Sequence, residues 1–403
     1  MVDCPCCGST INSAFSLGSS PYGDVYLQSE TDARNLKKHE VAISHCTECG
    51  SLTLDHRYDN IETAKHFIYE SSLTVGLTEC FDSIISKLLE EGSIENGLDI
   101  GSNDGTFLEI LSKKGVNGLG IEPAKQAYES CVKRGIEAYN CFFDESCVKR
   151  IEQSKRRFDL ITLNYVFANM LDLQTVLRNC LRLMSDKARV VITTGYHPIQ
   201  MSRGMVDYVY HEHYHYFTVT GISMLAKASG LAISSVFKVD AKGGSICIVL
   251  KKSDSLFEGS SVAGDWEERE SEDGWKQLIK VREAGHRYIR EICSLKRKIQ
   301  KCKDNGLTVI GFGASLSTSI LCHIDNFGEV LDFLVDDNQL KHGLYSPGFG
   351  IKVRSPQEIS LNGNNVIVVL AWQHRAGIEK RYKPVFADSM WLVPFEGVES
   401  TEI

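Results

Sequence analysis

"LDIGSNDGTFLEIL", residues 98–111, contains an apolar segment, a turn rich in glycine and carboxylates, and a helical segment in direct succession. The apolar segment predicts a buried strand, and the spacing of the later apolar residues predicts a helix. Gly101 and Gly105 allow the backbone between them to pass close to a ligand, and Asp99 and Asp104 are expected to bring carboxylates to the same place. This order of features predicts the first strand of a parallel α/β sheet with a ligand at its edge.

The same alternation continues after this stretch. "NGLGIEPA" (117–124) precedes the helical pattern of 125–135, and "RFDLITLNYV" (157–166) precedes that of 173–184. Residues 231–252 then form two apolar runs about a Gly-Gly turn, which predicts an antiparallel end to the sheet. Ahead of the first strand, residues 80–92 place Phe81, Ile84, Ile85, Leu88 and Leu89 on one helical stripe.

The C-terminal part predicts a second sheet. Residues 253–270 are acidic and rich in serine and glycine, which indicates a boundary, and a long charged helix is expected over about 265–305. "GLTVIGFGAS" (306–315) and the apolar run that ends at Asp336 then begin a Rossmann-like series of strands and helices. We therefore expect an α/β protein with a small zinc-binding domain (1–60), a central ligand-binding α/β domain (61–255) and a C-terminal Rossmann-like domain (256–403).

Composition narrows the classes of function. The chain has 403 residues, of which 43% are hydrophobic and 24% are charged, and its formal net charge is -8. An acidic chain lacks the basic surface of a general nucleic-acid or membrane binder. The sequence begins "MVDCPCCGST", without the basic and apolar regions of a signal peptide, and no apolar run is long enough to cross a bilayer. We expect a cytoplasmic protein that binds neither nucleic acid nor membrane.

Two cysteine pairs near the N-terminus predict a metal site. Cys4 and Cys7 form one C-x-x-C unit and Cys46 and Cys49 form another, with 38 residues between the units. Each unit can turn two thiolates toward one ion, and four sulfurs complete the tetrahedral coordination of zinc. Four cysteine ligands leave no open position, so the ion is expected to support folding rather than catalysis.

The turn at 101–105 predicts the kind of cofactor. Its carboxylates are poor hosts for a pyrophosphate and better suited to a ligand with cationic and hydroxyl groups. Glu122 lies 21 residues after Gly101, where an acidic side chain accepts hydrogen bonds from ribose hydroxyls. This spacing resembles that of the class I S-adenosylmethionine methyltransferases. The expected cofactor residues are Asp99, Gly101, Asn103, Gly105, Glu122, Pro123 and Asn164, although turn capping is an equally good account of Asn164.

A second chemical cluster is "VDYVYHEHYHYFT", residues 206–218, with three histidines and four tyrosines. Zinc binding is disfavoured because "HEH" lacks the i, i+4 spacing of a helical zinc motif. Histidine is easily poised near neutral pH, and with a methyl donor in place the cluster favours proton abstraction. A hydrogen-bonded loop is the alternative, and it is the favoured account of His211 and His215.

The order of these features resembles the sugar C-methyltransferases, which methylate nucleotide-linked 4-keto-deoxysugars at the neighbouring carbon, C-3. The motifs that carry the resemblance are the paired cysteine units, "LDIGSNDGTFL", "GIEPA", "YHEHYHYF", "GGS", "GFGAS", "GLYSPG" and "LAW". It implies that His213 removes the proton beside the ketone and that the enolate attacks the sulfonium methyl group. Tyr210 then donates to the enolate oxygen, Glu212 orients the histidine or binds a sugar hydroxyl, and Tyr69 faces the substrate. A monomer with a nucleotide-sugar substrate is expected.

The chain departs from that family at three places. The family usually has a histidine near Asn169, a more basic residue near Cys247, and a Lys-Gly-Asn run after "GFGAS", where this chain has "LSTSIL" beginning beside Ser317. All three fall where the nucleotide-sugar is expected to bind. The identity of the nucleotide and sugar is therefore open.

Three other functions are compatible with parts of the sequence. An O-methyltransferase needs a base but no ketone beside the acceptor. An NAD-dependent oxidoreductase would use the C-terminal "GFGASL", in which Gly311 and Gly313 can admit a phosphate, but Leu316 stands at the third glycine position. A zinc-ribbon adaptor would bind a protein partner and catalyse nothing.

Overall fold

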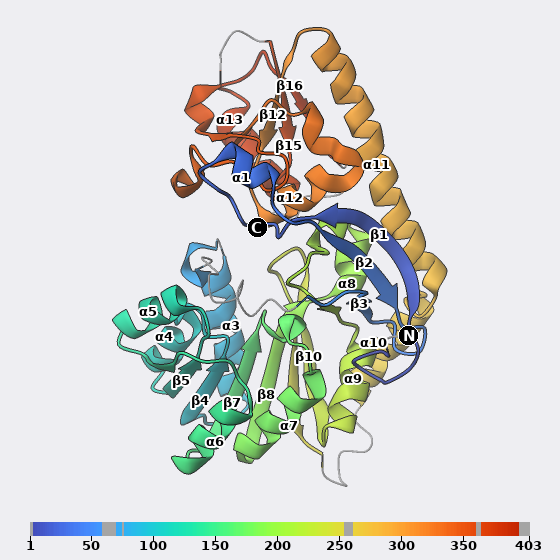
Figure 1. Cartoon of the computed structure of the whole chain (residues 1–403). Helices are drawn as coiled ribbons and strands as arrows, with labels where there is room; N and C mark the ends of the chain where they lie inside the picture. The colour runs from blue at the N-terminus through green and yellow to red at the C-terminus, as the bar shows by residue number, and fades with distance from the viewer. Residues whose placement is uncertain (1–2, 59–69, 75, 254–260, 360–363, 395–403) are drawn as a thin grey trace.

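The computed structural model describes residues 3–58, 70–74, 76–253, 261–359 and 364–394. These residues form three sheets in two lobes, with the central sheet in one lobe and the C-terminal sheet in the other (Figure 1). Helix α11 (Leu278–Asp304) runs along one side of both lobes (Figure 1). In the part of the chain that the structure describes, no helix is long and apolar enough to span a membrane.

The central sheet has seven strands in the order β10-β11-β8-β7-β4-β5-β6. Strand β4 is parallel to both β5 and β7, and β11 is antiparallel to both β8 and β10. The chain thus builds outward from β4 in both directions, which puts a topological switch point at the carboxyl end of β4. The strands are β4 (Asn96–Ile100), β5 (Asn117–Ile121), β6 (Glu137–Tyr139), β7 (Phe158–Asn164), β8 (Met184–Gly195), β10 (Leu231–Val239) and β11 (Ser245–Lys252).

Amphipathic helices cover this sheet. The predicted stripe on α3 buries Phe81, Ile84, Ile85 and Leu88, while Leu89 at its margin is only partly buried. The parallel sheet with helical crossovers and the antiparallel end at β10 and β11 are therefore confirmed. The helices are α3 (Leu77–Glu90), α4 (Thr106–Lys113), α5 (Lys125–Lys133), α6 (Glu145–Gln153), α7 (Leu173–Leu183), α8 (His197–Ser202) and α9 (Val219–Ala228), with short 3₁₀ turns at η1 (Ser71–Leu73), η2 (Phe167–Asn169) and η3 (Val206–Tyr208).

The N-terminal sheet is antiparallel and has four strands in the order β1-β2-β3-β9. Its last strand, β9, comes from the histidine-rich stretch 206–218, so a segment distant in sequence completes the sheet. Gly285 of α11 makes close packing with this sheet possible, because a Cβ there would lie 2.4 Å from the Phe15 ring. The elements are β1 (Asn12–Ser20), α1 (Glu30–Arg34), β2 (His39–His45), β3 (Leu52–Leu54) and β9 (His215–Tyr216).

The C-terminal sheet has five parallel strands in the order β14-β13-β12-β15-β16, as a Rossmann-like unit requires. Its core is continuous with that of the N-terminal sheet, since Ile43 and Val309 belong to one cluster of buried side chains that also includes Ile292 of α11. The strands are β12 (Thr308–Phe312), β13 (Phe333–Val335), β14 (Val353–Arg354), β15 (Asn365–Val369) and β16 (Met390–Leu392); the helices are α12 (Leu316–His323) and α13 (Arg375–Tyr382), with 3₁₀ segments η4 (Ile324–Val330), η5 (Gln339–Lys341), η6 (Pro356–Glu358) and η7 (Trp372–His374).

The single long helix predicted over 265–305 is wrong. The structure has two helices, α10 (Ser261–Glu272) and α11, separated by a turn. Gly274 in that turn has a φ of 75°, a left-handed conformation that glycine adopts without strain and that ends helices. Trp275 is buried next to it, so the chain changes direction around a side chain that joins the core. Charge periodicity alone does not show such a break.

Helix α10 docks on the central sheet through Glu270. This buried carboxylate accepts hydrogen bonds from the Tyr196 hydroxyl at 2.7 Å and from the Val219 and Thr220 amides at 2.6 and 3.0 Å. The two amides belong to the first turn of α9, where a negative charge is favourable. Burial nevertheless raises the pKa of Glu270.

We expect Glu270→Ala to destabilise the protein by about 3 kcal/mol, because it leaves several buried donors without an acceptor. The measurement is the free energy of unfolding in urea. Glu268→Ala, which changes an exposed residue of the same helix, is the matched control and is expected to alter the stability by less than about 0.5 kcal/mol. Equal stability of the two variants would contradict this account of α10.

Candidate active site

The four cysteines predicted to bind zinc lie together. Their sulfur atoms are all within 4.8 Å of one another, with Cys4 to Cys49 at 3.6 Å and Cys7 to Cys46 at 3.5 Å. A zinc ion with bonds of about 2.3 Å to four sulfurs at tetrahedral angles separates those sulfurs by about 3.8 Å. The donor set therefore fits zinc in both distance and chemistry.

The backbone explains why the thiols converge. The Gly8 amide donates to the Cys4 carbonyl and the Gly50 amide to the Cys46 carbonyl, each at 2.8 Å. Both glycines have a φ of 76°, so each C-x-x-C unit ends in a left-handed turn that points its two sulfurs the same way. Cys6 is buried beside the group but does not belong to it.

The carboxyl edge of the central sheet brings the predicted cofactor residues together. Asp99, Glu122 and Asn164 lie at the carboxyl ends of the neighbouring strands β4, β5 and β7. Ligands of open α/β sheets bind at this edge, beside the switch point. The tight turn 101–105 connects β4 to α4 in the same place, and Gly101 is packed so closely on Val166 that a Cβ would lie 2.8 Å from the valine side chain.

Glu122 holds that turn in shape. Its carboxylate accepts hydrogen bonds from the Asn103 amide at 2.9 Å and from the Ala124 amide at 2.7 Å. Asn103 needs this support because its φ of 50° is left-handed, like those of Gly101 and Gly105. A carboxylate has about four acceptor positions, so two remain for ribose hydroxyls. Burial raises the pKa of Glu122.

Asn140 supports the neighbouring residues, which sequence reasoning did not show. Its side-chain amide donates to the Glu122 carbonyl at 2.8 Å and to the Pro123 carbonyl at 3.0 Å. This fixes the segment that follows β5. Asn140 is polar and follows strand β6, and that position at the same sheet edge is the only sequence signal for it.

A chain of hydrogen bonds orients Asn164. Asp99 accepts from the Thr162 hydroxyl at 2.5 Å and from the Asn164 amide at 3.2 Å, and the Asn164 carbonyl oxygen accepts from Thr193 at 2.9 Å. Burial raises the pKa of Asp99 to about 7. The Asn164 side chain is therefore held by the side chains of β4 and β8 at the carboxyl edge of the sheet, and its contact with a ligand stays a prediction.

Asp104 does not contribute a carboxylate to the ligand side of the turn, contrary to the expectation that carboxylates gather there. Its side chain accepts from the Ser72 amide, from Thr106 and from Arg134, whose guanidinium lies 3.1 Å away. Although burial raises the pKa of Asp104, these hydrogen bonds hold it below the ordinary value. Asp104 therefore ties η1 to the start of α4.

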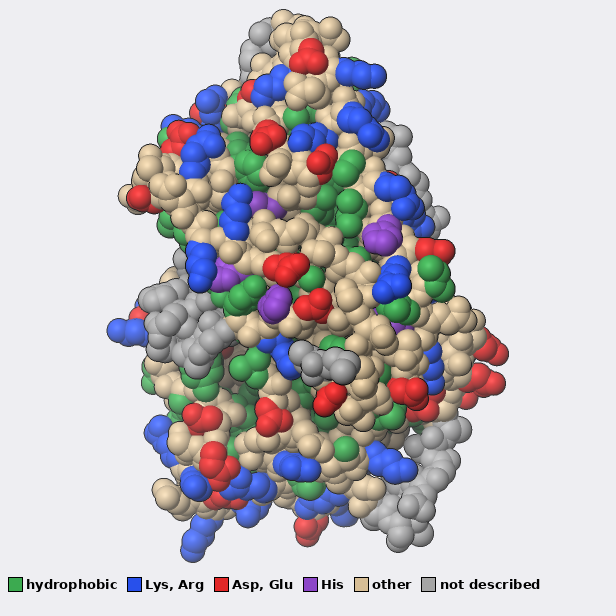
Figure 2. Space-filling view, turned by 45° about the vertical axis from the view of Figure 1, so that its right-hand side comes forward, with side chains coloured by type: hydrophobic (Ala, Val, Ile, Leu, Met, Phe, Trp, Pro, Cys, Tyr) green, Lys and Arg blue, Asp and Glu red, His purple; other side chains and the backbone are tan. Residues whose placement is uncertain are grey.

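The histidine-rich stretch crosses between the central sheet and the N-terminal sheet. The Tyr214 amide donates to the Ala168 carbonyl at 2.9 Å, and β9 pairs with β3 directly afterwards. A turn closed by the His213 amide and the Tyr210 carbonyl, at 3.1 Å, precedes it. Histidine side chains gather across the middle of the molecule, where the two lobes meet (Figure 2). The turn with the histidine predicted to be the base therefore directly precedes the segment that links η2 to the N-terminal sheet.

Two of the three histidines of the stretch are bound by the protein. His211 is within hydrogen-bond distance of the His39 carbonyl at 3.0 Å. His215 bridges the Thr53 hydroxyl, at 3.1 Å, and the Met170 carbonyl, at 3.0 Å. Burial lowers the pKa of His211 to about 4 and that of His215 to about 3. Both side chains therefore have structural contacts, as expected from the loop interpretation.

His213 differs from both. Neither of its ring nitrogens has a hydrogen bond within the described residues, and Nδ1 is buried without a partner. Its ring lies against the rings of Tyr216 and Tyr210, with centroids 4.4 and 5.6 Å away. Burial, and then the charge of Lys242, lowers the pKa of His213 to about 3. The imidazole is therefore neutral at neutral pH and has a lone pair to accept a proton.

Glu212, next to His213 in this turn, also has unused hydrogen-bonding capacity, as does the Nδ1 atom of His211. The Glu212 Oε2 atom is buried without a partner among the described residues. Burial, and then the charge of Asp24, raises the pKa of the carboxyl to about 7. Tyr210 is half-buried beside it. Tyr69, the fourth residue expected to face the substrate, lies outside the described residues.

The three departures from the family pattern lie in different surroundings. Asn169 ends η2 beside the histidine-rich stretch, and its side-chain oxygen is buried without a partner. Ser317 is in the first turn of α12, with its hydroxyl 3.0 Å from that of Ser315. Cys247 is fully buried in β11, opposite Thr193, and belongs to the sheet core. Cys247 is thus the departure that belongs to the sheet core, whereas Asn169 and Ser317 have polar side chains outside it.

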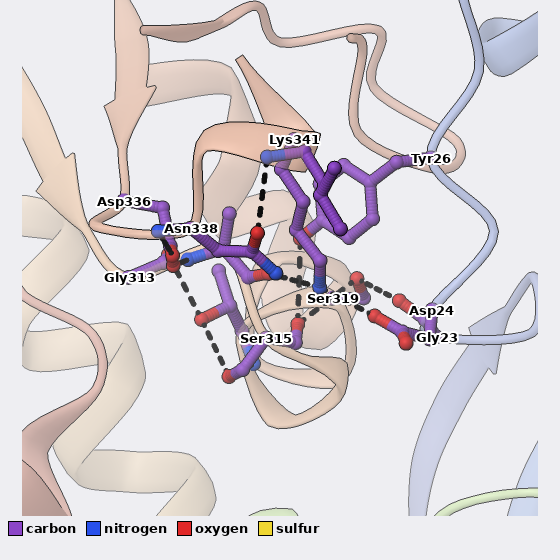
Figure 3. Close-up of polar contacts among 12 residues, drawn as sticks. Gly23, Asp24, Tyr26, Gly313, Ser315, Ser319, Asp336, Asn338 and Lys341 are labelled. Carbon is purple, nitrogen blue, oxygen red and sulfur yellow. Dashed lines mark hydrogen bonds and ion pairs between the residues drawn. The ribbon is translucent and has the colours of Figure 1, made fainter. Parts of the chain in front are cut away.

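The C-terminal glycine turn is covered by the N-terminal chain. Lys341 donates to Asp24 at 2.6 Å and to the Ala314 carbonyl at 2.8 Å, and the Ser319 hydroxyl donates to the Gly23 carbonyl at 2.6 Å (Figure 3). The turn's own Ala314 amide donates to Asp336 at 2.6 Å. The glycine turn, α12 and η5 are therefore joined to residues 23 and 24 by side-chain hydrogen bonds.

Comparison with known proteins agrees with this architecture. Residues 240–395 match the family model described as "C-methyltransferase C-terminal domain", and residues 77–236 match a "methyltransferase domain". The C-methyltransferase NovU of Streptomyces niveus is 23% identical over 363 residues, which cover 89% of this chain and 86% of NovU.

Solved structures resemble part of the chain. The N-methyltransferase NodS of Bradyrhizobium japonicum, in complex with S-adenosylhomocysteine, is 16% identical with a TM-score of 0.37 and covers 50% of this chain and 100% of its own. An S-adenosylmethionine-dependent methyltransferase of Clostridium acetobutylicum is 15% identical with a TM-score of 0.35 and covers 44% of this chain and 92% of its own.

The seven-stranded sheet, its glycine turn and the two matching family models together define an S-adenosylmethionine-dependent methyltransferase. Within that class, residues 240–395 match the C-terminal domain of the C-methyltransferases, and NovU is similar to this chain along nearly its whole length.

Proposed function

We propose that the protein transfers a methyl group from S-adenosylmethionine to the carbon beside the ketone of a nucleotide-linked 4-keto-deoxysugar. The observation that carries this proposal is His213, the one histidine of its stretch whose ring has no hydrogen bond within the described residues. The C-methyltransferase family supports carbon rather than oxygen as the acceptor, which disfavours an O-methyltransferase. The motif resemblance implies the ketosugar.

His213 would act as the general base. A carbon attacks a sulfonium methyl group only after it has lost a proton, and a ketone makes the neighbouring proton removable. The neutral imidazole accepts that proton, the electron pair of the C–H bond moves into the enolate, and negative charge gathers on the ketone oxygen. Tyr210 would donate to that oxygen. Glu212, with its unsatisfied oxygen, would bind a sugar hydroxyl.

The cofactor would lie at the carboxyl edge of the central sheet. The turn 101–105 would pass close to it, Glu122 would accept from its ribose hydroxyls, and Asp99 and Asn164 would border its methionine part. S-adenosylmethionine would supply a methyl group bonded to a sulfonium sulfur, which leaves as a neutral thioether with the electron pair of the broken S–C bond. The residues of this chain supply the binding, the orientation and the removal of the acceptor proton.

We also propose that zinc occupies the group formed by Cys4, Cys7, Cys46 and Cys49. The sulfur geometry and the paired left-handed turns support this proposal. Since β9 carries the end of the histidine-rich stretch into the same sheet, the metal would stabilise the sheet on which the base-bearing turn depends. Its role would be structural.

The test of the methyl transfer is incubation with S-adenosylmethionine and a panel of nucleotide-linked 4-keto-6-deoxysugars, followed by mass spectrometry. The expected result is the gain of one methyl group by at least one of them. A panel with matching 4-hydroxy sugars is the control and is expected to gain none. Methylation of the hydroxy sugars alone would contradict the proposal.

Glu122→Ala is expected to weaken S-adenosylmethionine binding by on the order of 2 kcal/mol, because two charge-assisted hydrogen bonds to ribose are lost. Calorimetry measures the dissociation constant. Glu129→Ala, at an exposed position of the following helix α5, is the control and is expected to bind as the unchanged protein does. An unchanged constant in folded Glu122→Ala would remove Glu122 from the cofactor site.

A further inference from the structure

Lys242 lies beside the cofactor edge, and the residue after it lies beside the histidine-rich stretch, since a Cβ at Gly243 would be 3.8 Å from the Tyr208 hydroxyl. Lys242 belongs to the turn that connects β10 and β11. Its ammonium nitrogen is 4.3 Å from the centroid of the Tyr165 ring, a cation–π distance. Tyr165 directly follows Asn164, so the ammonium group stands beside the carboxyl end of β7. The sequence showed only a Gly-Gly turn at this position.

The backbone of this turn is held firmly. The Gln200 side chain donates to the Lys242 carbonyl at 3.3 Å, and the Arg203 side chain donates to the Gly243 carbonyl at 3.1 Å. Gly243 has a φ of 76°, and the Met205 side chain packs directly against it: the Met205 methyl carbon is 1.9 Å from the position that a Cβ would take. Helix α8 and the residues after it therefore set the position of the lysine relative to the sheet.

The same ammonium group acts on His213. Its positive charge lowers the pKa of the imidazole, in addition to the effect of burial. The other groups around the ring are the phenols of Tyr210 and Tyr216, the neighbouring Glu212 carboxyl, and His215. In this set, Lys242 is the cation whose charge acts on His213.

We infer that Lys242 is a catalytic residue that stabilises the enolate oxygen formed when His213 removes the proton. This inference rests on the proposed function. The C–H electron pair becomes part of the enolate, the imidazole keeps the proton, and the enolate carbon then takes the methyl group while the sulfur keeps the electron pair of the broken S–C bond. Lys242 transfers no proton in this sequence. Its charge balances the charge that develops on oxygen.

A cation at Lys242 would explain how His213 can remove a proton although its pKa is lowered. In the free enzyme, the ammonium charge opposes protonation of His213. In the proposed complex, the negative charge of the enolate would offset the charge of the ammonium group, and the imidazole would then hold the proton more readily. A preorganised charge of this kind acts most strongly at the moment when charge develops, which is when it accelerates the reaction.

The test compares Lys242→Met with Lys238→Met, a control at an exposed position of β10. Lys242→Met is expected to lower kcat by about 100-fold to 1,000-fold and to slow solvent deuterium exchange beside the ketone without S-adenosylmethionine to a similar degree. Lys242→Asn, which suits the left-handed φ of 48° at this position, is expected to do the same. Lys242→Arg is expected to retain more activity than either, and Lys238→Met to match the unchanged protein.

A second readout does not need the sugar. Nuclear magnetic resonance titration of the His213 imidazole is expected to show a higher pKa in Lys242→Met than in the unchanged protein, because a nearby positive charge has gone. If the unchanged enzyme methylates a ketosugar and Lys242→Met matches it in kcat and exchange, Lys242 has no catalytic role, while the proposed function stands. If the unchanged enzyme neither exchanges nor methylates any ketosugar, the proposed function and this role both fail. A His213 pKa that Lys242→Met leaves unchanged overturns the inference as well.

Discussion

His213→Asn is expected to lower methyl transfer by roughly 100-fold to 10,000-fold, the usual contribution of a positioned general base. The cause is the loss of the imidazole lone pair, since asparagine cannot accept the proton. The dissociation constant of S-adenosylmethionine is expected to stay the same, because His213 makes no hydrogen bond to the cofactor edge. Solvent deuterium exchange beside the ketone is expected to fall together with turnover, because exchange requires only deprotonation.

His211→Asn is the matched control, two residues away in the same turn. Its ring contacts the His39 carbonyl, so its loss is expected to reduce stability more than chemistry. Tyr210→Phe is expected to give an intermediate rate. If His213→Asn exchanges and turns over almost normally while Glu212→Gln abolishes both, the base is misassigned. If all four variants are active, the stretch is only a loop.

The second large effect is expected at the metal centre. The purified protein is expected to contain about one zinc per chain, and Cys46→Ser is expected to lower the melting temperature strongly, because metal binding contributes directly to folding. Elemental analysis and thermal unfolding measure the two quantities. The residual folded fraction is expected to keep its chemistry, since the sulfur atoms do not contact the cofactor edge.

Cys6→Ser is the control for this prediction, because Cys6 is a buried neighbour outside the group of four. It is expected to keep its zinc. Freshly purified protein without stoichiometric metal, or a Cys46→Ser variant as stable as Cys6→Ser, would contradict the zinc assignment.

The sequence predicts those strands, turns and helices that depend on neighbouring residues alone. Strand β4, its glycine turn and helix α4 follow from apolar periodicity and from glycines that here adopt left-handed φ angles. The convergence of the C-x-x-C units follows from their spacing and is found in the structure. The edge of the sheet also places Asp99, Glu122 and Asn164 together, because parallel neighbouring strands end on the same side.

Long-range pairing is not visible in the sequence. Strand β9 completes the N-terminal sheet because residues 215 and 216 pair with residues 53 and 52 of β3, which are distant in sequence. A strand of two residues is also too short to show a periodic pattern. The break between α10 and α11 depends on Trp275 entering a core that the sequence does not reveal. The direction of the Asp104 side chain could not be predicted, because its partners Ser72 and Arg134 are about 30 residues away in the sequence.

Long-range contacts also explain why the sequence did not point to Lys242 and did not distinguish the three histidines from one another. A lysine in a glycine turn is common, and only the fold brings it near Tyr165 and His213. The carbonyls that bind His211 and His215 belong to residues 39 and 170. The three histidines are close in sequence, but the rings of His211 and His215 have hydrogen bonds that the His213 ring lacks within the described residues.

The most direct test of carbon methylation is to locate the transferred methyl group. The enzyme is incubated with S-adenosylmethionine labelled with carbon-13 in its methyl group and with the ketosugar that gains mass, and the product is studied by nuclear magnetic resonance. The predicted result is a labelled methyl group bonded to the carbon beside the ketone, with correlations to that ring carbon. A labelled methyl group bonded to oxygen would contradict the account.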